Sequence, residues 1–113
     1  MPKTRVILEL GAGNDLHGAD YTKAALRAVQ DALHHSSLSF VRSLKIDKTN
    51  LDVEVTIGVQ RPEQVDLEKV KNSLPVGNVT VSAVKGGLDV ADTENNDPAV
   101  IASAAIAVRI EVA

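Results

Sequence analysis

The sequence predicts an α+β fold, a two-layer sandwich in which two helices pack on one face of a four-stranded mixed sheet. Two observations lead to this expectation. Several segments alternate apolar and polar residues, and two others repeat apolar residues every three or four positions. The expected order is strand, helix, a short element, strand, helix, strand, strand. With 113 residues the chain can bury one core and has no room for a second, so residues 1–113 should form a single domain.

The first strand is expected over Thr4–Leu10, where the side chains alternate between two faces. Gly11 and Gly13 should end this strand and let the chain turn sharply, because glycine accepts a positive φ. One face of the strand carries Val6, Leu8 and Leu10, and the other carries Arg5, Ile7 and Glu9.

The most regular helical pattern begins at Tyr21, after Asp20, whose carboxylate can cap the free amides of a first turn. Small residues dominate the apolar stripe of this helix, which should let it lie close to the sheet; the stripe consists of Tyr21, Ala24, Ala25, Ala28, Val29, Ala32 and Leu33. At its end, His34 and His35 can hydrogen-bond free carbonyls, and Ser36 and Ser37 should stop the helix.

Residues Ser36 to Ile46 fit two different structures. Their apolar side chains suit a short strand at one spacing and a helical turn at another, and we expect a short helical continuation. If residues 38–46 form a strand instead, the order becomes βαββαβ, a ferredoxin-like arrangement with an added C-terminal strand.

The second half of the chain predicts further strands and one more helix. Leu51–Gln60 alternates strictly and is the clearest strand. The helix should be capped by Asp66, should point Leu67, Val70 and Leu74 inward, and should stop at Pro75 and Gly77. The remaining expected elements are a strand over Val79–Val84 that bends at Gly86 and Gly87 and continues through Leu88 and Val90, a loop over Asp92–Pro98, and a final strand over Ser103–Val112.

The second face of the predicted sheet is small and mixed in character, neither a lysine-rich solvent face nor a second core. Such a face can meet its symmetry mate, because small side chains let sheets approach and charges can pair at the rim. We therefore expect a homo-oligomer. This face collects Ile7, Thr56, Thr80, Ser82, Val84, Ala105 and Ala107, with charges at Arg5, Glu9, Asp52, Glu54, Arg109 and Glu111.

Composition excludes several classes of function. Twelve basic and fifteen acidic residues give a net charge of −3, with no block of like charge, so neither a nucleic acid nor a membrane is an expected partner. The chain has no cysteine, which excludes disulfides and thiolate zinc sites and fits a reducing compartment. The apolar run before Gly11 is too short for a signal peptide or a membrane span, so a cytoplasmic location is expected.

Polar residues follow the predicted strands at what should be one edge of the sheet. In a βαβ unit the two strands are parallel, so the end of the first strand lies on the same edge as the end of the second. This edge should form a pocket for a small polar or anionic molecule. Its expected ligand-binding residues are Gly11, Gly13, Asn14, Asp15, Lys23, Arg61, Lys85 and Gly86, with His17 as a candidate catalytic residue.

Two more specific functions, dinucleotide binding and metal binding, have weaker support in the same segment. A dinucleotide fingerprint would need a third glycine where the chain has Leu16, and no acidic residue ends a second strand. Asp15, His17 and Asp20 could ligate a metal, or a carboxylate could orient His17 as a general base. No second pair of ligands supports a metal, so we predict no metal site, and the cofactor remains unknown.

Three stretches resemble known families: Glu9–Leu38, Val53–Asp66 and Val84–Val90. Together they look like a small conserved-hypothetical bacterial family named after a Listeria locus tag, which implies a compact cytosolic α/β protein and no particular activity. Gly13–Asn14 and Asp20–Lys23 are also similar to a motif in one repeat of the cyanuric acid hydrolase and barbiturase group, in which three repeats surround a central site. A homotrimer could imitate that arrangement, although the serine–lysine pairs of that group have no counterpart here.

These observations leave three hypotheses for the function. The first is a homo-oligomer that binds a small polar or anionic molecule at the Gly11–Lys23 edge. The second is a cyclic amide ring-opening hydrolase with His17 as base and a serine or a metal-bound water as nucleophile. The third is a non-catalytic structural or interaction protein that uses the second face of the sheet.

Overall fold

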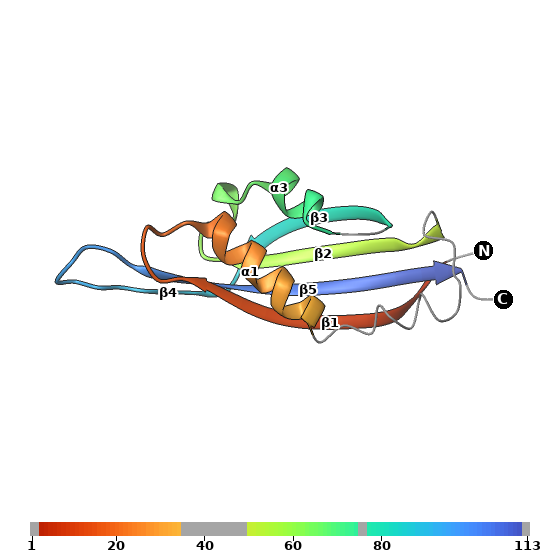
Figure 1. Cartoon of the computed structure of the whole chain (residues 1–113), viewed down its shortest axis with the longest axis horizontal. Helices are drawn as coiled ribbons and strands as arrows, with labels where there is room; N and C mark the ends of the chain where they lie inside the picture. Colours follow the sequence, from red (N-terminus) through yellow and green to blue (C-terminus); the bar gives the residue numbers. More distant parts are fainter. Residues whose placement is uncertain (1–2, 35–49, 75–76, 112–113) are drawn as a thin grey trace.

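The structure, a computed structural model, describes residues 3–34, 50–74 and 77–111. Two helices and a short 3₁₀ turn lie on one face of a five-stranded mixed sheet (Figure 1). The elements are β1 (Lys3–Asp15), α1 (Tyr21–His34), β2 (Asp52–Val59), η2 (Pro62–Gln64), α3 (Leu67–Asn72), β3 (Asn78–Lys85), β4 (Leu88–Val90) and β5 (Ala99–Glu111).

The sheet order is β1-β5-β2-β3, and β4 pairs with the first residues of β5. The α+β class and the two-layer arrangement are as predicted, but the sheet has five strands instead of four. The difference arises at Gly86 and Gly87, where the chain leaves β3 and crosses to β5 as a separate strand. Gly87 has φ +63°, and a Cβ there would lie 2.1 Å from the carbonyl oxygen of Ile101. The turn therefore requires glycine at that position.

Strand β1 is longer than the sequence pattern predicted. Instead of ending at Leu10 it continues to Asp15, because every residue from Ile7 onward pairs with β5. The prediction that Gly11 and Gly13 make the turn is therefore wrong. The positive φ values lie later, at Gly18 (+92°) and Ala19 (+49°).

Gly11 and Gly13 instead let helix α1 lie directly against β1. A Cβ on Gly13 would be 2.3 Å from the backbone nitrogen of Ala28, and one on Gly11 would be 2.4 Å from that of Ala32. Real Cβ atoms do not approach backbone so closely, so only glycine fits at these two strand positions.

The two faces of β1 are the reverse of the predicted ones. Ile7 is only 6% exposed and belongs to the core, whereas Leu10 is 64% exposed and points away from the helices. The face that meets α1 carries Gly11 and Gly13, and a leucine there would clash with the helix backbone. Alternation predicts two faces but not which one the helix covers. A register shift between Arg5 and Ile7 also interrupts the alternation, so these two residues do not share a face as the sequence pattern predicted.

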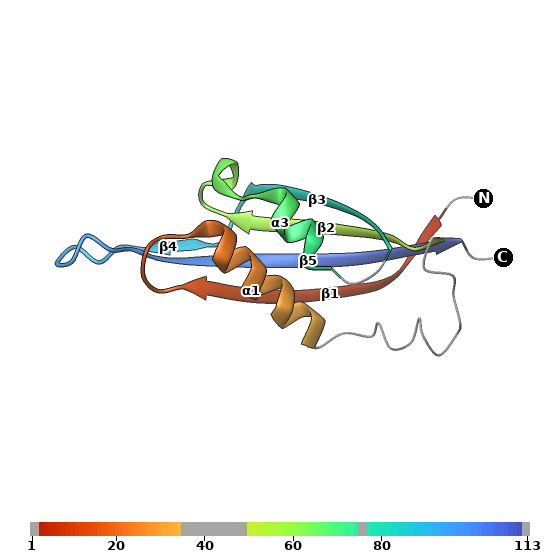
Figure 2. The ribbon, with the colours of Figure 1, turned by 45° about the horizontal axis from the view of Figure 1, so that its top comes forward.

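The core lies between the inner face of the sheet and the two helices, as predicted (Figure 2). The alanines of α1 are fully buried against β1 and β5, and α3 packs against β3 and α1. The inner face is supplied by the residues that the alternation indicated in the second and last strands: Val53, Val55, Ile57 and Val59 of β2, and Ala104, Ile106 and Val108 of β5. Strand β5 starts earlier than expected, at Ala99, because its first residues pair with β4 and β1.

Both predicted helix caps are present. The Asp20 carboxylate accepts a hydrogen bond of 3.0 Å from the Lys23 amide, and the Asp66 carboxylate accepts one of 3.2 Å from the Lys69 amide. In α3, Val70 is fully buried, but Leu67 is 39% exposed and only partly inward.

Several predictions fall outside the described residues. They concern the Leu38 to Ile46 segment, His35, Ser36, Ser37 and Pro75. Among the residues that are described, no helix has the length and apolar character needed to cross a membrane.

Candidate functional site

The predicted edge exists. Strands β1, β2 and β3 run parallel to one another, since β1 and β2 are each antiparallel to β5 and β3 is parallel to β2. Their last residues, Asp15, Val59 and Lys85, therefore lie at the same end of the sheet. The pleat then sends alternate residues to opposite faces. The predicted site residues are consequently divided between the helix-covered inner face and the outer face.

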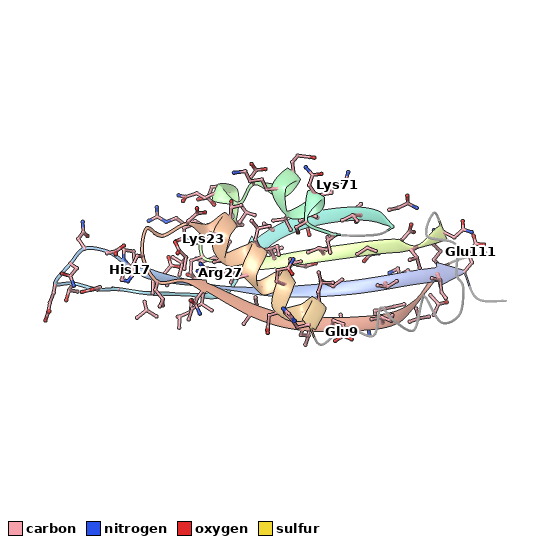
Figure 3. All side chains as sticks on the ribbon, viewed as in Figure 1. Glu9, His17, Lys23, Arg27, Lys71 and Glu111 are labelled. Atoms are coloured by element: carbon pink, nitrogen blue, oxygen red, sulfur yellow. The ribbon has the colours of Figure 1, made fainter. Side chains whose placement is uncertain are left out.

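On the inner face, Asp15 ties the β1–α1 loop to helix α1. Its side chain is 5% exposed, and one carboxylate oxygen accepts a hydrogen bond of 3.0 Å from the Asp20 amide. The other oxygen lies 3.7 Å from Lys23 Nζ and 3.8 Å from Arg27. Lys23 and Arg27 come from successive turns of α1, as Figure 3 shows. With these partners around it, the Asp15 carboxylate holds the loop in place and faces no open space.

Arg27 also donates a hydrogen bond of 2.7 Å to the backbone carbonyl of Asn14. Arg27 was not predicted as a residue of this site. Its spacing of four from Lys23 on one helix face could have identified it, since residues four apart are neighbours on a helix surface. The Asn14 side chain lies on the outer face, because Asn14 pairs with Ile101 and is exposed.

His17 joins two loops. Its side chain is 87% exposed, and Nδ1 lies 3.0 Å from an oxygen of the Asp97 carboxylate. The other Asp97 oxygen accepts a hydrogen bond of 2.8 Å from the Gly18 amide. These two hydrogen bonds, first that of Gly18 and then that of His17, hold the pKa of Asp97 below its usual value. Figure 3 places His17 where the β1–α1 loop meets the β4–β5 hairpin. The described residues contain no group of three or more potential metal ligands, at His17 or elsewhere.

A second hydrogen-bonded pair lies behind this loop, between Tyr21 of α1 and Asp89 of β4. The Tyr21 hydroxyl donates to one Asp89 oxygen, and the other, buried Asp89 oxygen has no hydrogen-bond partner among the described residues. Burial, and next the hydrogen bond and negative charge of Asp89, raise the pKa of Tyr21, while the positive charge of Arg61 opposes that rise. Arg61 therefore acts on the inner face. The sequence carries no signal for this pair, because it joins residues 68 positions apart.

On the outer face, a hollow of about 340 Å³ lies over the ends of β2 and β3. It forms because Gly58 contributes no side chain in the middle of the sheet and the Gly86 backbone packs directly against it. The Gln60 side chain fixes this turn by donating to the carbonyl of Gly86 at 3.0 Å. The hollow is lined by Leu10, Gly11, Thr56, Gly58, Val84, Lys85, Gly86, Ser103, Ala104 and Ala105.

Three of the predicted ligand-binding residues thus meet in one place: Gly11, Lys85 and Gly86. Lys85 is exposed and pairs with the inner-face residue Val59, so its backbone borders the hollow while its side chain points to the inner face. Asn14 lies on the same outer face of β1, two residues after Ala12. Gly13, Asp15, Lys23 and Arg61 lie on the inner face and do not line the hollow.

Comparison with known proteins identifies a family and a similar crystal structure. The model of the family described as "Conserved hypothetical protein (Lin0512_fam)" matches residues 5–108. A crystal structure from Nostoc punctiforme, described as an FtsZ-like protein of unknown function, is 36% identical, covers 99% of both chains and superimposes with a TM-score of 0.84. No curated protein matches the chain. The resemblance to the cyanuric acid hydrolase and barbiturase group is not shown by these comparisons.

Proposed function

The chain belongs to the conserved hypothetical family Lin0512_fam, and we propose from its geometry that it is a homo-oligomeric protein that binds a small anionic molecule in the outer-face hollow. One observation carries this proposal, the hollow over Gly58, into which the hydroxyl-bearing side chains of Thr56 and Ser103 face. Hydroxyl donors in a preformed concavity can bind a carboxylate or phosphate group.

The size and lining of the hollow define the ligand class. About 340 Å³ is near the lower end of the range for small-molecule pockets, so the ligand should be small. Leu10, Val84 and Ala105 supply an apolar wall, while the hydroxyls of Thr56 and Ser103 supply donors. A short carboxylic acid or phosphate ester with a small apolar body meets these requirements.

The inner-face residues have a supporting role in this proposal. Asp15, Lys23 and Arg27 fix the loop that follows β1, and the Arg27 contact fixes the backbone at Asn14. Asn14 then presents its amide on the outer face, next along the strand from the hollow. Of the residues predicted to bind ligand, we assign direct contact to Asn14, Gly11, Lys85 and Gly86.

A thermal-shift panel tests the proposal, with inorganic phosphate, butyrate, benzoate and a cyclic ureide added to the whole chain. A ligand at about 100 times its Kd adds roughly 2.7 kcal/mol to the free energy of unfolding. We expect a rise in Tm with at least one anion, absent in Thr56→Val and kept in the matched control Thr80→Val. Thr80 is an exposed threonine of β3 that does not line this hollow. No shift with any anion, or an equal shift in the Thr56→Val variant, would refute binding at the hollow.

A second candidate function, hydrolysis of a cyclic amide, rests on the His17–Asp97 pair. A carboxylate 3.0 Å from Nδ1 orients an imidazole so that the other nitrogen can act as a base. In this case the whole chain should open a cyclic ureide ring, and His17→Ala should abolish that turnover without changing Tm in the anion panel. Absence of turnover by the native chain would eliminate this candidate.

A further inference from the structure

The outer face of the sheet exposes more apolar side chains than any other described surface. Both helices cover the inner face, and nothing in the described residues covers the outer one (Figure 2). Monomeric proteins rarely leave large contiguous apolar patches in water, so such a face indicates an interaction surface. The exposed residues on this face are Val6, Leu8 and Leu10 of β1, Val84 of β3, and Leu88 and Val90 of β4.

The two halves of this face, on either side of the central strand β5, have complementary shapes. On the β1 side Leu10 projects into solvent, whereas on the β2–β3 side the hollow lies over Gly58. Leu10 and Thr56 pair with the same residue of β5, Ala105, so the projection and the rim of the hollow lie at the same level of the sheet. A protruding side chain and a hollow at matching positions can interlock when the face meets a copy of itself.

The charges on this face follow the same division. Arg5 on β1 and Asp52 on β2 both pair with Arg109 of β5, so they lie at one level on opposite sides of it. No hydrogen bond or ion pair involves Arg5 in the part of the chain that the structure describes. On the β2 side both carboxylates have partners in their own chain: Glu54 binds Arg109 at 2.9 Å, and Asp52 binds Lys3 of β1 at 3.0 Å. When two copies meet in this register, Arg5 of one copy lies opposite the partly exposed Asp52 carboxylate of the other, which can accept a second cation.

The area of the face matches what a specific interface needs. At about 3.3 Å per residue, the 13 residues of β5 span roughly 43 Å. Strand β1 has the same length, whereas β2 and β3 have 8 residues each and span roughly 26 Å. At about 4.8 Å between strands the face covers about 660 Å², which is within the range that one partner contributes to a stable interface.

We propose that a second copy of this chain covers the outer face, with the Leu10 half of each copy against the hollow half of the other. In a dimer with a two-fold axis parallel to β5, the Leu10 half of each copy meets the hollow half of the other. In a ring, the Leu10 half of each copy meets the hollow half of the next copy. The partner's Leu10 then closes the hollow at Gly58, so the binding site is complete only in the assembly. This last point rests on the proposed function, but the association itself does not.

The first test measures the mass of the whole chain by sedimentation equilibrium between 1 and 100 µM protein. We expect a multiple of 11.9 kDa for the native chain and for the control Leu67→Glu, whose side chain is exposed on α3. The variant Leu10→Glu should return to 11.9 kDa while keeping its native circular dichroism. A native mass of 11.9 kDa throughout, or an unchanged assembly in Leu10→Glu, would overturn the inference.

A cysteine pair tests the register directly, because the native chain has no cysteine. Within one chain β5 separates Leu10 from Thr56, so their Cα atoms are roughly 10 Å apart, too far for a disulfide. Sheets stacked face to face are also about 10 Å apart, so the probe is a bismaleimide cross-linker with a reach of about 10 Å, added to a mixture of two single variants. It should link the Leu10→Cys chain to the Thr56→Cys chain, and it should leave the control mixture of Leu67→Cys and Thr56→Cys unlinked. An unlinked mixture of Leu10→Cys and Thr56→Cys would contradict this register.

The two proposals can fail separately. A monomeric chain whose Tm still rises with phosphate would overturn the self-association inference and leave the ligand site standing. An assembled chain with no response to any anion would overturn ligand binding and leave the interface standing.

Discussion

Replacing Gly13 by alanine would add one methyl group at the closest contact between the sheet and a helix. The new Cβ would lie 2.3 Å from the Ala28 nitrogen and 2.6 Å from the Ala24 carbonyl oxygen. Carbon atoms pack at about 3.5 to 4.0 Å from their neighbours. Both clashing atoms belong to the helix backbone and cannot rotate away, so α1 as a whole must move outward by about 1 Å.

The cost of that movement follows from what α1 buries. Its six buried side chains are four alanines, Val29 and Tyr21. At about 0.8 kcal/mol per methyl group and about 2 kcal/mol for each larger side chain, their burial contributes roughly 7 kcal/mol. A gap of 0.5 to 1 Å forfeits about a quarter to a half of contact energy. The loss is then about 2 to 3 kcal/mol, and the entropic gain of about 0.4 to 1 kcal/mol from Gly→Ala leaves a net loss of about 2 kcal/mol.

Urea unfolding followed by far-ultraviolet circular dichroism measures this loss, at one protein concentration for all variants because association adds to stability. We expect the midpoint to fall with an unchanged slope, and Tm to fall by about 8 °C. Gly86→Ala is the matched control, since the nearest atoms to its Cβ would be the Cα of Gly58 at 3.2 Å and the carbonyl carbon of Gly58 at 3.6 Å, much farther than the contacts at Gly13. Its stability should stay within about 0.5 kcal/mol of the native value.

A Gly13→Ala chain as stable as the native one would refute this reasoning. It would mean that the helix does not lie against β1 as closely as the structure shows. A loss of equal size in Gly86→Ala would point to a general cost of alanine in this sheet and not to the helix contact.

Three other changes give separate checks. Asp15→Ala leaves the amide at the start of α1 without its acceptor, so urea unfolding should show a loss of about 1 to 2 kcal/mol; no loss would mean that water replaces the carboxylate. Tyr21→Phe removes the donor to Asp89 and should cost about 1 to 2 kcal/mol at pH 7. Because the folded pKa of Tyr21 is raised, its contribution to stability should be fully present below about pH 10 and be lost as the pH rises through the higher folded pKa, a dependence that the phenylalanine variant should lack. The pKa of Asp97 is lowered, so its contribution should be present above about pH 3.9 and be lost as the pH falls through the lower folded value. An acid titration of Asp97→Asn that matches the native one would contradict this.

The elements that could be predicted are those whose pattern depends only on neighbours in the chain. Strict alternation predicted β2 and most of β5, and the small-residue stripe after Asp20 predicted α1 together with its close packing. The parallel arrangement of β1, β2 and β3 followed from their connections, so the common edge of the site was predicted as well.

The candidate site was predictable only in part, because the pleat of a strand separates residues that are adjacent in the sequence. Residues at adjacent positions, such as Gly13 and Asn14, were grouped by their place in the sequence, but a strand sends them to opposite faces. The Tyr21–Asp89 pair and the role of Gly58 in the hollow depend on contacts between residues far apart in the chain. No local pattern marks such contacts.

The sequence by itself determined the class of fold, the order of its main elements and the two sets of side chains on each strand. It did so because period and capping are properties of the local backbone. Only the tertiary structure decided which set on β1 is buried. The helix can approach that strand only where Gly11 and Gly13 leave room, and that choice places Ile7 in the core and leaves Leu10 exposed beside the hollow.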